Sequence, residues 1–437
     1  MQLPWRMKKL LTDLRSSFWF IPALVVALAA ALALGAVELD AAVGDAALAK
    51  HPRLFGAGAE GTRQLLSAIA SSTITVAGVV FSITIVALSL TAAQYSPRVL
   101  RNFMRDRANQ LVLGIFVGIY VYCLLVLRTI RGGEDAFVPG ISMLGGVGFA
   151  LIGIGVLIFF IHHIATSIQV SEIAARVARE TVAALAEQHG RPGGQADPQA
   201  PALPDQMSWR AVPALATGYI QAFEKGRLLD YARDRRCTVR MERAAGDFVV
   251  AGEMLLSVAG ADPDEAQVKH LNRASAINTY RDVAQDPAFG VQQLVDIALK
   301  ALSPGINDTA TARNSLDYLT AILFEAARHP QAAEERYSEG GRLLLVAMNR
   351  SFDFYIASTF DPIRRSSVHD VDMMVHSLRA LARIARSSRT AACRVPIAKQ
   401  LDAIEQTIAG GTYAAADKSK LDLAVHEVRN AIARDDA

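Results

Sequence analysis

Eight of the 21 residues from Ser71 to Thr91 are serine or threonine, although the stretch is apolar enough to cross a membrane. On a helix, residues spaced by four, three, four and seven share one face, and here they are Ser71, Thr75, Gly78, Ser82 and Ser89. Hydroxyl groups on such a face can replace part of the water shell of a permeating solute. The pattern also suits plain packing, because small residues let membrane helices approach closely and hydroxyls can bond to their own i−4 carbonyls.

A cluster of arginines follows this stretch directly. The uncharged window ends at Pro97, and four basic residues lie within the next ten positions: Arg98, Arg101, Arg105 and Arg107. If several subunits assembled around the helix, these arginines would form a basic ring that favours anions. Alternatively, they anchor the helix end to anionic lipid. The simpler interpretation is that the hydroxyl residues serve helix packing and the arginines serve membrane anchoring. The functional interpretation is that both line a pore.

Two adjacent histidines, His162 and His163, end the last apolar segment in the run IFFIHHIATS. Adjacent helical positions point about 100° apart, so the two imidazoles cannot readily bind one metal ion. The simplest interpretation is a pair of imidazoles at the level of the lipid headgroups. A functional alternative is that one of them faces the helix bundle and acts as a pH-sensing gate. Haem binding is a further alternative, but no partner ligand set is visible in the other apolar segments.

A helix start in the second half of the chain is a candidate anion site. The run ALSPGINDTATARNSLDYL closes one helix and opens another, with Asn307 or Asp308 as the N-cap. An anion or a nucleotide phosphate can rest on the free N–H groups of a helix start, and Arg313 would lie nearby. A tight interhelical turn is the simpler interpretation. The sequence contains neither a phosphate loop with its lysine nor a GxGxxG motif.

The sequence contains no pattern that predicts catalysis or a metal centre. Cys123, Cys237 and Cys393 are far apart and odd in number. His369 and His376 share a helix face, but seven residues correspond to about 10.5 Å of helical rise, too far for both to bind one ion. Hydrolase, zincin and kinase motifs are absent from the sequence. We therefore predict no catalytic residue, no metal and no cofactor, and expect the protein not to be an enzyme.

The composition indicates a protein that lies partly in a membrane. Hydrophobic residues make up 52% of the 437 residues, and the balance of 45 Lys+Arg against 42 Asp+Glu is no footprint of nucleic-acid binding. Four uncharged windows are long enough to span a bilayer: 16–37, 64–97, 108–127 and 136–161. The first exceeds a signal-peptide core, so we expect an uncleaved anchor. No charged residue lies deep within these windows, which argues against an ion-coupled carrier.

The short loops set the expected orientation. The N-terminal tail and the 98–107 loop are basic, whereas the two other loops are acidic or balanced. By the positive-inside rule, both termini face the cytoplasm. We therefore expect a four-helix transmembrane region with a helical cytoplasmic extension over 1–188.

The remainder of the chain is expected to be soluble. A Gly- and Pro-rich linker covers 189–206, a small β-rich cytoplasmic subdomain 207–262, and a helical subdomain 263–437. Further helices are expected at 308–328, 341–357, 366–388, 394–409 and 415–434. The predicted fold class is thus mainly α, with a four-helix membrane region followed by a cytoplasmic α+β domain.

Several runs of the sequence are specific enough to suggest a family. They include FSITIVALSLTAAQYSPRVLRNF, GIFVGIYVYCLLVLRTI and DPAFGVQQLVDIALKALSPGINDTATA. They resemble bacterial membrane proteins known as domain of unknown function family 2254, over nearly the whole chain. Thr309 departs from the pattern, because a proline is expected after IND. The resemblance implies a bacterial inner-membrane protein with a cytoplasmic C-terminal domain, and it brings no activity and no assigned site.

Three functions from different classes remain open. The first is an oligomeric channel for a small ion, with a regulatory cytoplasmic domain. The second is a membrane-anchored sensor or scaffold whose cytoplasmic domain binds a ligand or a protein. The third is an intramembrane redox protein, which rests on His162 and His163 alone. We favour the channel, and the small-residue faces of the third and fourth windows, such as Gly114 with Gly118, predict a homo-oligomer in the lipid bilayer.

Overall fold

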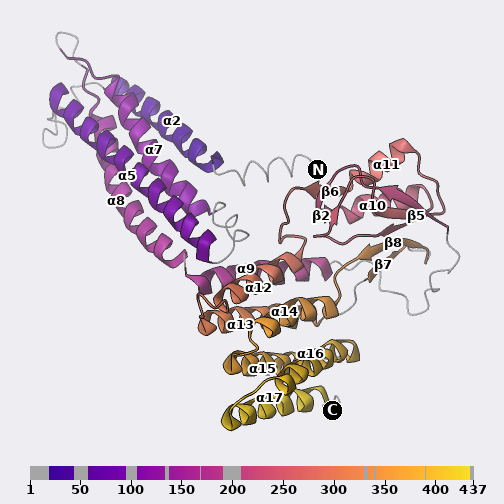
Figure 1. Ribbon diagram of the computed structural model, residues 1–437. Coiled ribbons are helices and arrows are strands. Elements are labelled where there is room, and N and C mark those ends of the chain that lie inside the picture. Colours follow the sequence, from indigo (N-terminus) through magenta and orange to yellow (C-terminus); the bar gives the residue numbers. More distant parts are fainter. Residues whose placement is uncertain are drawn as a thin grey trace. The chain divides into compact units, whose positions relative to one another are not determined.

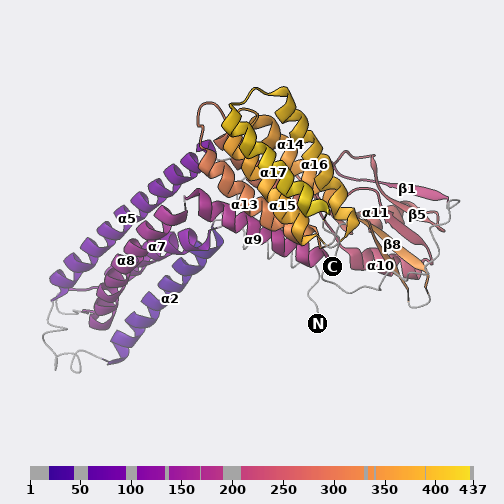
Figure 2. The same ribbon diagram turned by 90° about the horizontal axis from the view of Figure 1, so that it is seen from below.

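Figures 1 and 2 show a computed structural model of the chain. The structure describes residues 19–43, 58–94, 106–132, 137–167, 169–189, 208–328, 333–338, 341–388 and 390–433. The chain divides into two compact units at the boundary between Gln169 and Val170. The N-terminal unit consists of long apolar helices, and the C-terminal unit contains both strands and helices.

Four helices build the N-terminal unit: α2 (Phe20–Val43), α5 (Ala59–Gln94), α7 (Arg107–Leu127) and α8 (Gly140–Ser167). Each is long and apolar enough to cross a membrane. Helices suit this environment because they satisfy all their backbone polar groups internally. Helix α7 contacts the three others, with α2 and α5 on either side of it (Figures 1 and 2). The 36 residues of α5 give it a length of about 54 Å, longer than the hydrocarbon core of about 30 Å.

Small residues bring the helices of this unit close together. A Cβ on Gly114 of α7 would lie 2.9 Å from Pro22 Cα of α2, and a Cβ on Gly118 would lie 3.2 Å from Ala29 Cβ. On α8, a Cβ on Gly146 would lie 2.8 Å from Leu66 Cδ2. These small-residue faces therefore pack against other helices of the same chain, where the close approach increases dispersion contacts. They do not support the homo-oligomer that the sequence led us to expect from them.

Two sheets lie in the C-terminal unit. The larger has the order β1-β5-β3-β8-β7 and contains β1 (Trp209–Pro213), β3 (Thr238–Met241), β5 (Met254–Ala259), β7 (Ala333–Tyr337) and β8 (Leu343–Met348). The smaller has the order β4-β2-β6 and contains β2 (Gly218–Phe223), β4 (Phe248–Val249) and β6 (Ser275–Asn278). Helix α10 (Lys225–Asp234) contacts β3 and β8, and α11 (Glu265–Asn272) contacts α10. Only the β3–β8 pair is parallel among the described strand pairs.

Strand β8 corrects the expected helix over 341–357. The run LLLVAM is short and continuously apolar, and such a run fits a buried strand as well as a helix. This run forms a strand because it pairs with β3 on one side and with β7 on the other. The following helix begins only at Phe352, after the N-cap Ser351. Strands β6, β7 and β8 therefore come from the region that the sequence assigned to helices alone.

The remaining helices stack in layers, as Figure 1 shows. They are α9 (Val170–His189), α12 (Pro287–Ala301), α13 (Thr309–Ala326), α14 (Phe352–Ser366), α15 (Val371–Ser387), α16 (Ala391–Gly410) and α17 (Ala415–Ala433). Helix α9, expected as an extension of the membrane region, belongs to this unit because its apolar stripe packs on α12 and α13. A Cβ on Gly290 of α12 would lie only 1.8 Å from Thr181 Oγ1 of α9. Glycine at this position thus permits the α9–α12 contact.

Candidate functional site

The face of α5 formed by Ser71, Thr75, Gly78, Ser82 and Ser89, here called the hydroxyl face, points away from the helix bundle. All five residues are exposed. Thr75 donates its hydroxyl hydrogen to the Ser71 carbonyl at 2.8 Å, which leaves the lone pairs of its oxygen available. The opposite side of α5 is buried in the bundle and carries Thr73 and Thr84, which donate to the carbonyls of Ile69 and Val80. Among the described residues of a single chain, the hydroxyl face therefore lines no enclosed space.

The outer surfaces of the neighbouring helices differ in chemistry. Helix α2 exposes Leu24, Leu28 and Leu32, and α8 exposes Leu151 and Ile158. These are side chains that lipid tails solvate well. The hydroxyl face interrupts this apolar surface along several turns of α5. On α5 itself, apolar side chains such as Ile85 and Val86 are exposed on either side of it, so the hydroxyl face is distinguished by its composition.

The two histidines occupy different environments. His163 is half-buried and its Nε2 lies 2.8 Å from Asp106 Oδ2, while His162 is exposed. Asp106 also caps α7 by accepting from Ala108 N at 2.9 Å. The Ser167 hydroxyl lies 3.3 Å from the same His163 nitrogen. His163 therefore connects the end of α8 to the start of α7.

A buried amide lies one turn beyond this contact. Asn109 is 3% exposed, and neither polar atom of its side chain has a hydrogen-bond partner among the described residues. An unpaired buried amide is costly in an apolar surrounding. Of the expected basic collar, Arg107 is the exposed first residue of α7. Arg98, Arg101 and Arg105 lie outside the described residues.

A carboxylate that the sequence analysis did not select lies at the other end of the bundle. Asp40 of α2 is 3% exposed and accepts hydrogen bonds from Ile141 N, Ser142 N and the Ser142 hydroxyl at 2.8, 2.9 and 2.5 Å. It therefore caps α8 from another helix, and Tyr122 donates to the Ser142 carbonyl beside it. The sequence placed Asp40 in a loop, because the first apolar window ends at Val37. The continuing apolar pattern of LGAVELDAAV was the signal that α2 extends to Val43.

The proposed anion site at the start of α13 contains a carboxylate of its own. Asp308 is the N-cap and accepts from Thr311 N at 3.0 Å and from the Thr311 hydroxyl at 2.6 Å. These bonds lower the pKa of Asp308. Asn307 adopts a left-handed backbone with φ of 48°, and Arg313 is exposed. Anion binding here stays a prediction, and an anion would meet the negative charge of Asp308.

A buried ion pair connects the small sheet to α12. Asp286 is 1% exposed, caps α12 through Phe289 N, and accepts from Arg281 Nε at 2.7 Å. Gly246 passes over this carboxylate with φ of +90°, and a Cβ there would lie 2.3 Å from Asp286 Oδ2. Burial raises the pKa of Asp286, and its bond with Arg281 opposes that rise. The Asp-Pro pair before an apolar run was the sequence signal for this cap.

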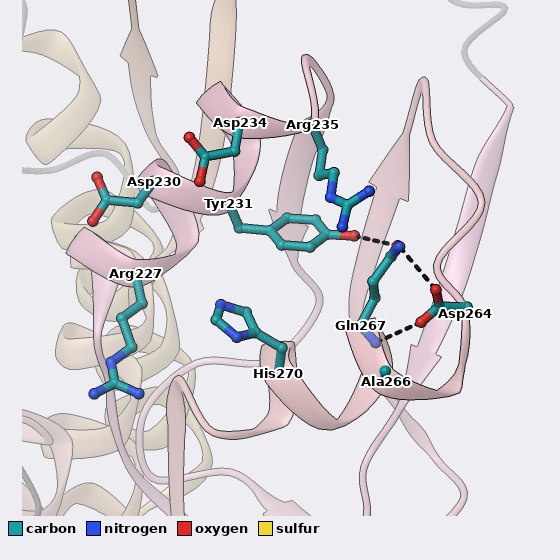
Figure 3. Close-up of a pocket in the computed structure, with 9 residues that line it drawn as sticks. All are labelled: Arg227, Asp230, Tyr231, Asp234, Arg235, Asp264, Ala266, Gln267 and His270. Atoms are coloured by element: carbon teal, nitrogen blue, oxygen red, sulfur yellow. Dashed lines mark hydrogen bonds between the residues drawn. The ribbon is translucent and has the colours of Figure 1, made fainter.

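The C-terminal unit also contains a pocket between α10 and α11 (Figure 3). Its volume is about 450 Å³, and its lining residues are Arg227, Asp230, Tyr231, Asp234, Arg235, Asp264, Ala266, Gln267 and His270. The Tyr231 ring is stacked on the His270 ring with centroids 6.0 Å apart. Burial raises the pKa of the Tyr231 phenol, so this hydroxyl stays protonated and donates to Gln267 Oε1 at 3.1 Å. No sequence motif predicts this pocket, because it forms between two helices that are separate in the sequence.

Comparison with known proteins gives relatives over most of the chain. A family model described as predicted membrane protein (DUF2254) matches residues 15–383. An uncharacterized protein of Mycobacterium tuberculosis (strain CDC 1551 / Oshkosh) is 31% identical over 409 residues, which cover 91% of this chain and 77% of that protein. An uncharacterized protein of Mycobacterium bovis has the same identity and coverage. No solved structure matches the chain.

Proposed function

The chain belongs to the DUF2254 family of predicted membrane proteins, and on this premise we propose that it is an oligomeric ion channel or pore of the bacterial inner membrane. In this proposal the four apolar helices span the bilayer, and both termini and the C-terminal unit lie in the cytoplasm. The basic N-terminal tail and the basic 98–107 loop support this orientation. The C-terminal unit regulates the pore.

The outward exposure of the hydroxyl face carries this proposal. A stripe of Ser, Thr and Gly on the outer surface of a membrane helix has little to gain from lipid tails, whereas α2 and α8 present leucine and isoleucine there. Several copies that assembled with α5 toward a common axis would place the five residues around one path. Hydroxyl oxygens that keep free lone pairs, as that of Thr75 does, can then replace water around a small ion.

The pore-lining role of α5 is tested by ion flux into proteoliposomes. We expect Ser82→Trp to reduce flux to background, because an indole at the middle of the hydroxyl face would fill the path. The matched control is Leu151→Trp, which adds the same side chain at a 66% exposed position on α8. It should retain flux, since that surface faces lipid in the proposal.

The oligomeric state is measured on the same preparations by mass determination in detergent. Equal loss of flux in both variants would point to a general folding defect and would count against a pore at α5. A strictly monomeric protein that conducts would also contradict the proposal, because the hydroxyl face encloses no space within the part of one chain that the structure describes. Undiminished flux in Ser82→Trp would have the same consequence.

We further propose that His163 gates this path. The His163 ring contacts Asp106 and so joins the start of α7 to the end of α8. In this proposal the contact makes flux respond to pH. His163→Gln should abolish that response, and the exposed neighbour His162→Gln should leave it intact. A pH dependence that survives in His163→Gln would exclude this gate.

A second function is supported by the pocket between α10 and α11. A membrane-anchored sensor needs a ligand site in its soluble part, and a pocket of about 450 Å³ has the size of small-molecule sites. In this alternative the four helices serve only as an anchor. The two functions are compatible if the ligand regulates the pore. Absence of flux together with ligand binding would favour the sensor alone.

A further inference from the structure

The pocket between α10 and α11 contains charged groups that the fold itself does not use. Within the lining, Asp230 pairs with Arg233 at 2.9 Å, and Gln267 is held by Asp264 through its backbone and side-chain nitrogens at 2.8 and 3.1 Å. Asp234, Arg235 and His270 differ from these. Their side chains make no hydrogen bond or ion pair with the part of the chain that the structure describes. One carboxylate, one guanidinium and one imidazole are therefore available to a ligand.

The charges are arranged around two stacked rings, of which Tyr231 is buried and His270 is exposed. Figure 3 shows Asp230 and Asp234 toward the Cβ end of the Tyr231 ring, and the Arg235 guanidinium toward its hydroxyl end. The ring of His270 lies beside Tyr231. A ligand that lies along these two rings thus meets negative charge at one end and positive charge at the other.

The balance of charge limits the ligand further. Both signs of charge line the pocket, with three carboxylates (Asp230, Asp234 and Asp264) and two guanidiniums (Arg227 and Arg235). Asp230 is already paired with Arg233, so Asp234 is the carboxylate and Arg235 the guanidinium that a ligand can use. The carboxylates repel polyanions such as nucleotides. A ligand with a carboxylate at one end and an ammonium group at the other matches this arrangement.

We propose that this pocket binds a dibasic amino acid of the lysine or ornithine class. The ligand carboxylate accepts two hydrogen bonds from Arg235, the geometry for which the guanidinium fork is suited. The distal ammonium group donates to Asp234, and the methylene chain lies along the exposed ring of His270, which stacks on the buried Tyr231 ring. This inference rests on the second proposed function, ligand binding by the C-terminal unit, and it names the ligand class and the residues.

Binding of L-lysine to the full-length protein in detergent, measured by isothermal titration calorimetry, tests the proposal. We expect saturable binding of lysine, weaker binding of 1,5-diaminopentane, which lacks the carboxylate, and none of glutamate. Arg235→Gln should weaken lysine binding about tenfold or more and leave 1,5-diaminopentane unaffected. Asp234→Asn should weaken both. Arg328→Gln removes the same charge at an exposed position in the turn after α13 and should change neither.

Two results would overturn the proposal. One is a lack of lysine binding by protein whose thermal unfolding is normal. The other is lysine binding that Arg235→Gln and Asp234→Asn leave unchanged. If another ligand binds and these variants abolish its binding, the pocket is a ligand site but the assigned class is wrong. Lysine binding by a protein that shows no ion flux would support this inference and contradict the proposal that the protein is a channel.

Discussion

An Asp40→Ala variant is expected to lose much of the stability of the four-helix unit. Asp40 is 3% exposed, and its carboxylate accepts hydrogen bonds from two backbone N–H groups and one hydroxyl at the start of α8. The change to alanine leaves these three buried donors without their acceptor. Each unsatisfied buried donor costs about 1–3 kcal/mol, so we expect a loss of roughly 3 kcal/mol or more. The bond also joins α2 to α8, so its loss loosens the contact between two helices.

Thermal unfolding of the full chain in detergent measures this effect. Asp40→Asn keeps one acceptor oxygen and should fall between the wild type and alanine. Glu38→Ala is the matched control, because Glu38 is an exposed carboxylate two residues away on the same helix. It should change little. If Glu38→Ala and Asp40→Ala unfold at the same temperature, the capping contact contributes nothing specific.

The second large effect is expected at Gly246, where a methyl group would meet the buried ion pair. Gly246→Ala must adopt φ near +90° and would bring its Cβ to 2.3 Å from Asp286 Oδ2. The backbone conformation alone costs about 1–2 kcal/mol, and overpacking adds about 1–3 kcal/mol. Either the carboxylate moves away from Arg281 or the small sheet shifts from α12. We expect a total loss of roughly 2–5 kcal/mol from these two terms.

Gly252 provides a control with nearly the same φ angle. Its φ is +96°, and no atom lies within 4 Å of an added Cβ. Gly252→Ala should therefore show only the conformational cost of about 1–2 kcal/mol. Protease susceptibility of the full chain under increasing urea, read on fragments of the C-terminal unit, measures both variants.

The collision with Asp286 can be isolated by a double variant. Asp286→Ala alone removes a buried cap and leaves Arg281 without its carboxylate, so it is destabilising. Combined with Gly246→Ala, it should cost less than the sum of the two, because the added methyl group then occupies the space of the missing carboxylate. Strict additivity, or equal effects at Gly246 and Gly252, would show that Asp286 is not what the methyl group meets.

Local features of the sequence were sufficient for the membrane helices. Length and apolarity fall within single segments, so four spans could be predicted, with ends that differ by a few residues. The fold class followed in the same way, and the family resemblance was confirmed by the match over residues 15–383. The error over 341–357 has a local cause as well, since a short apolar run such as that of β8 is ambiguous until its neighbours are known.

The candidate sites depended on more than local features. Spacing placed Ser71, Thr75 and Ser82 on one face of a helix, and tertiary packing decided that this face is the exposed one. The same packing turned Gly114 and Gly118 toward α2 of the same chain. Helical periodicity states which residues share a face, but it does not state which neighbour that face meets.

The sequence by itself therefore determined that this is a membrane protein with four apolar helices and a mixed C-terminal unit, because hydrophobic length and periodicity are properties of each segment. Only the tertiary structure decided that Asp40 caps α8, that His163 meets Asp106, and that α10 and α11 enclose a pocket. Each of these pairs residues from different elements. Such contacts depend on how helices pack against one another, and no single segment encodes them.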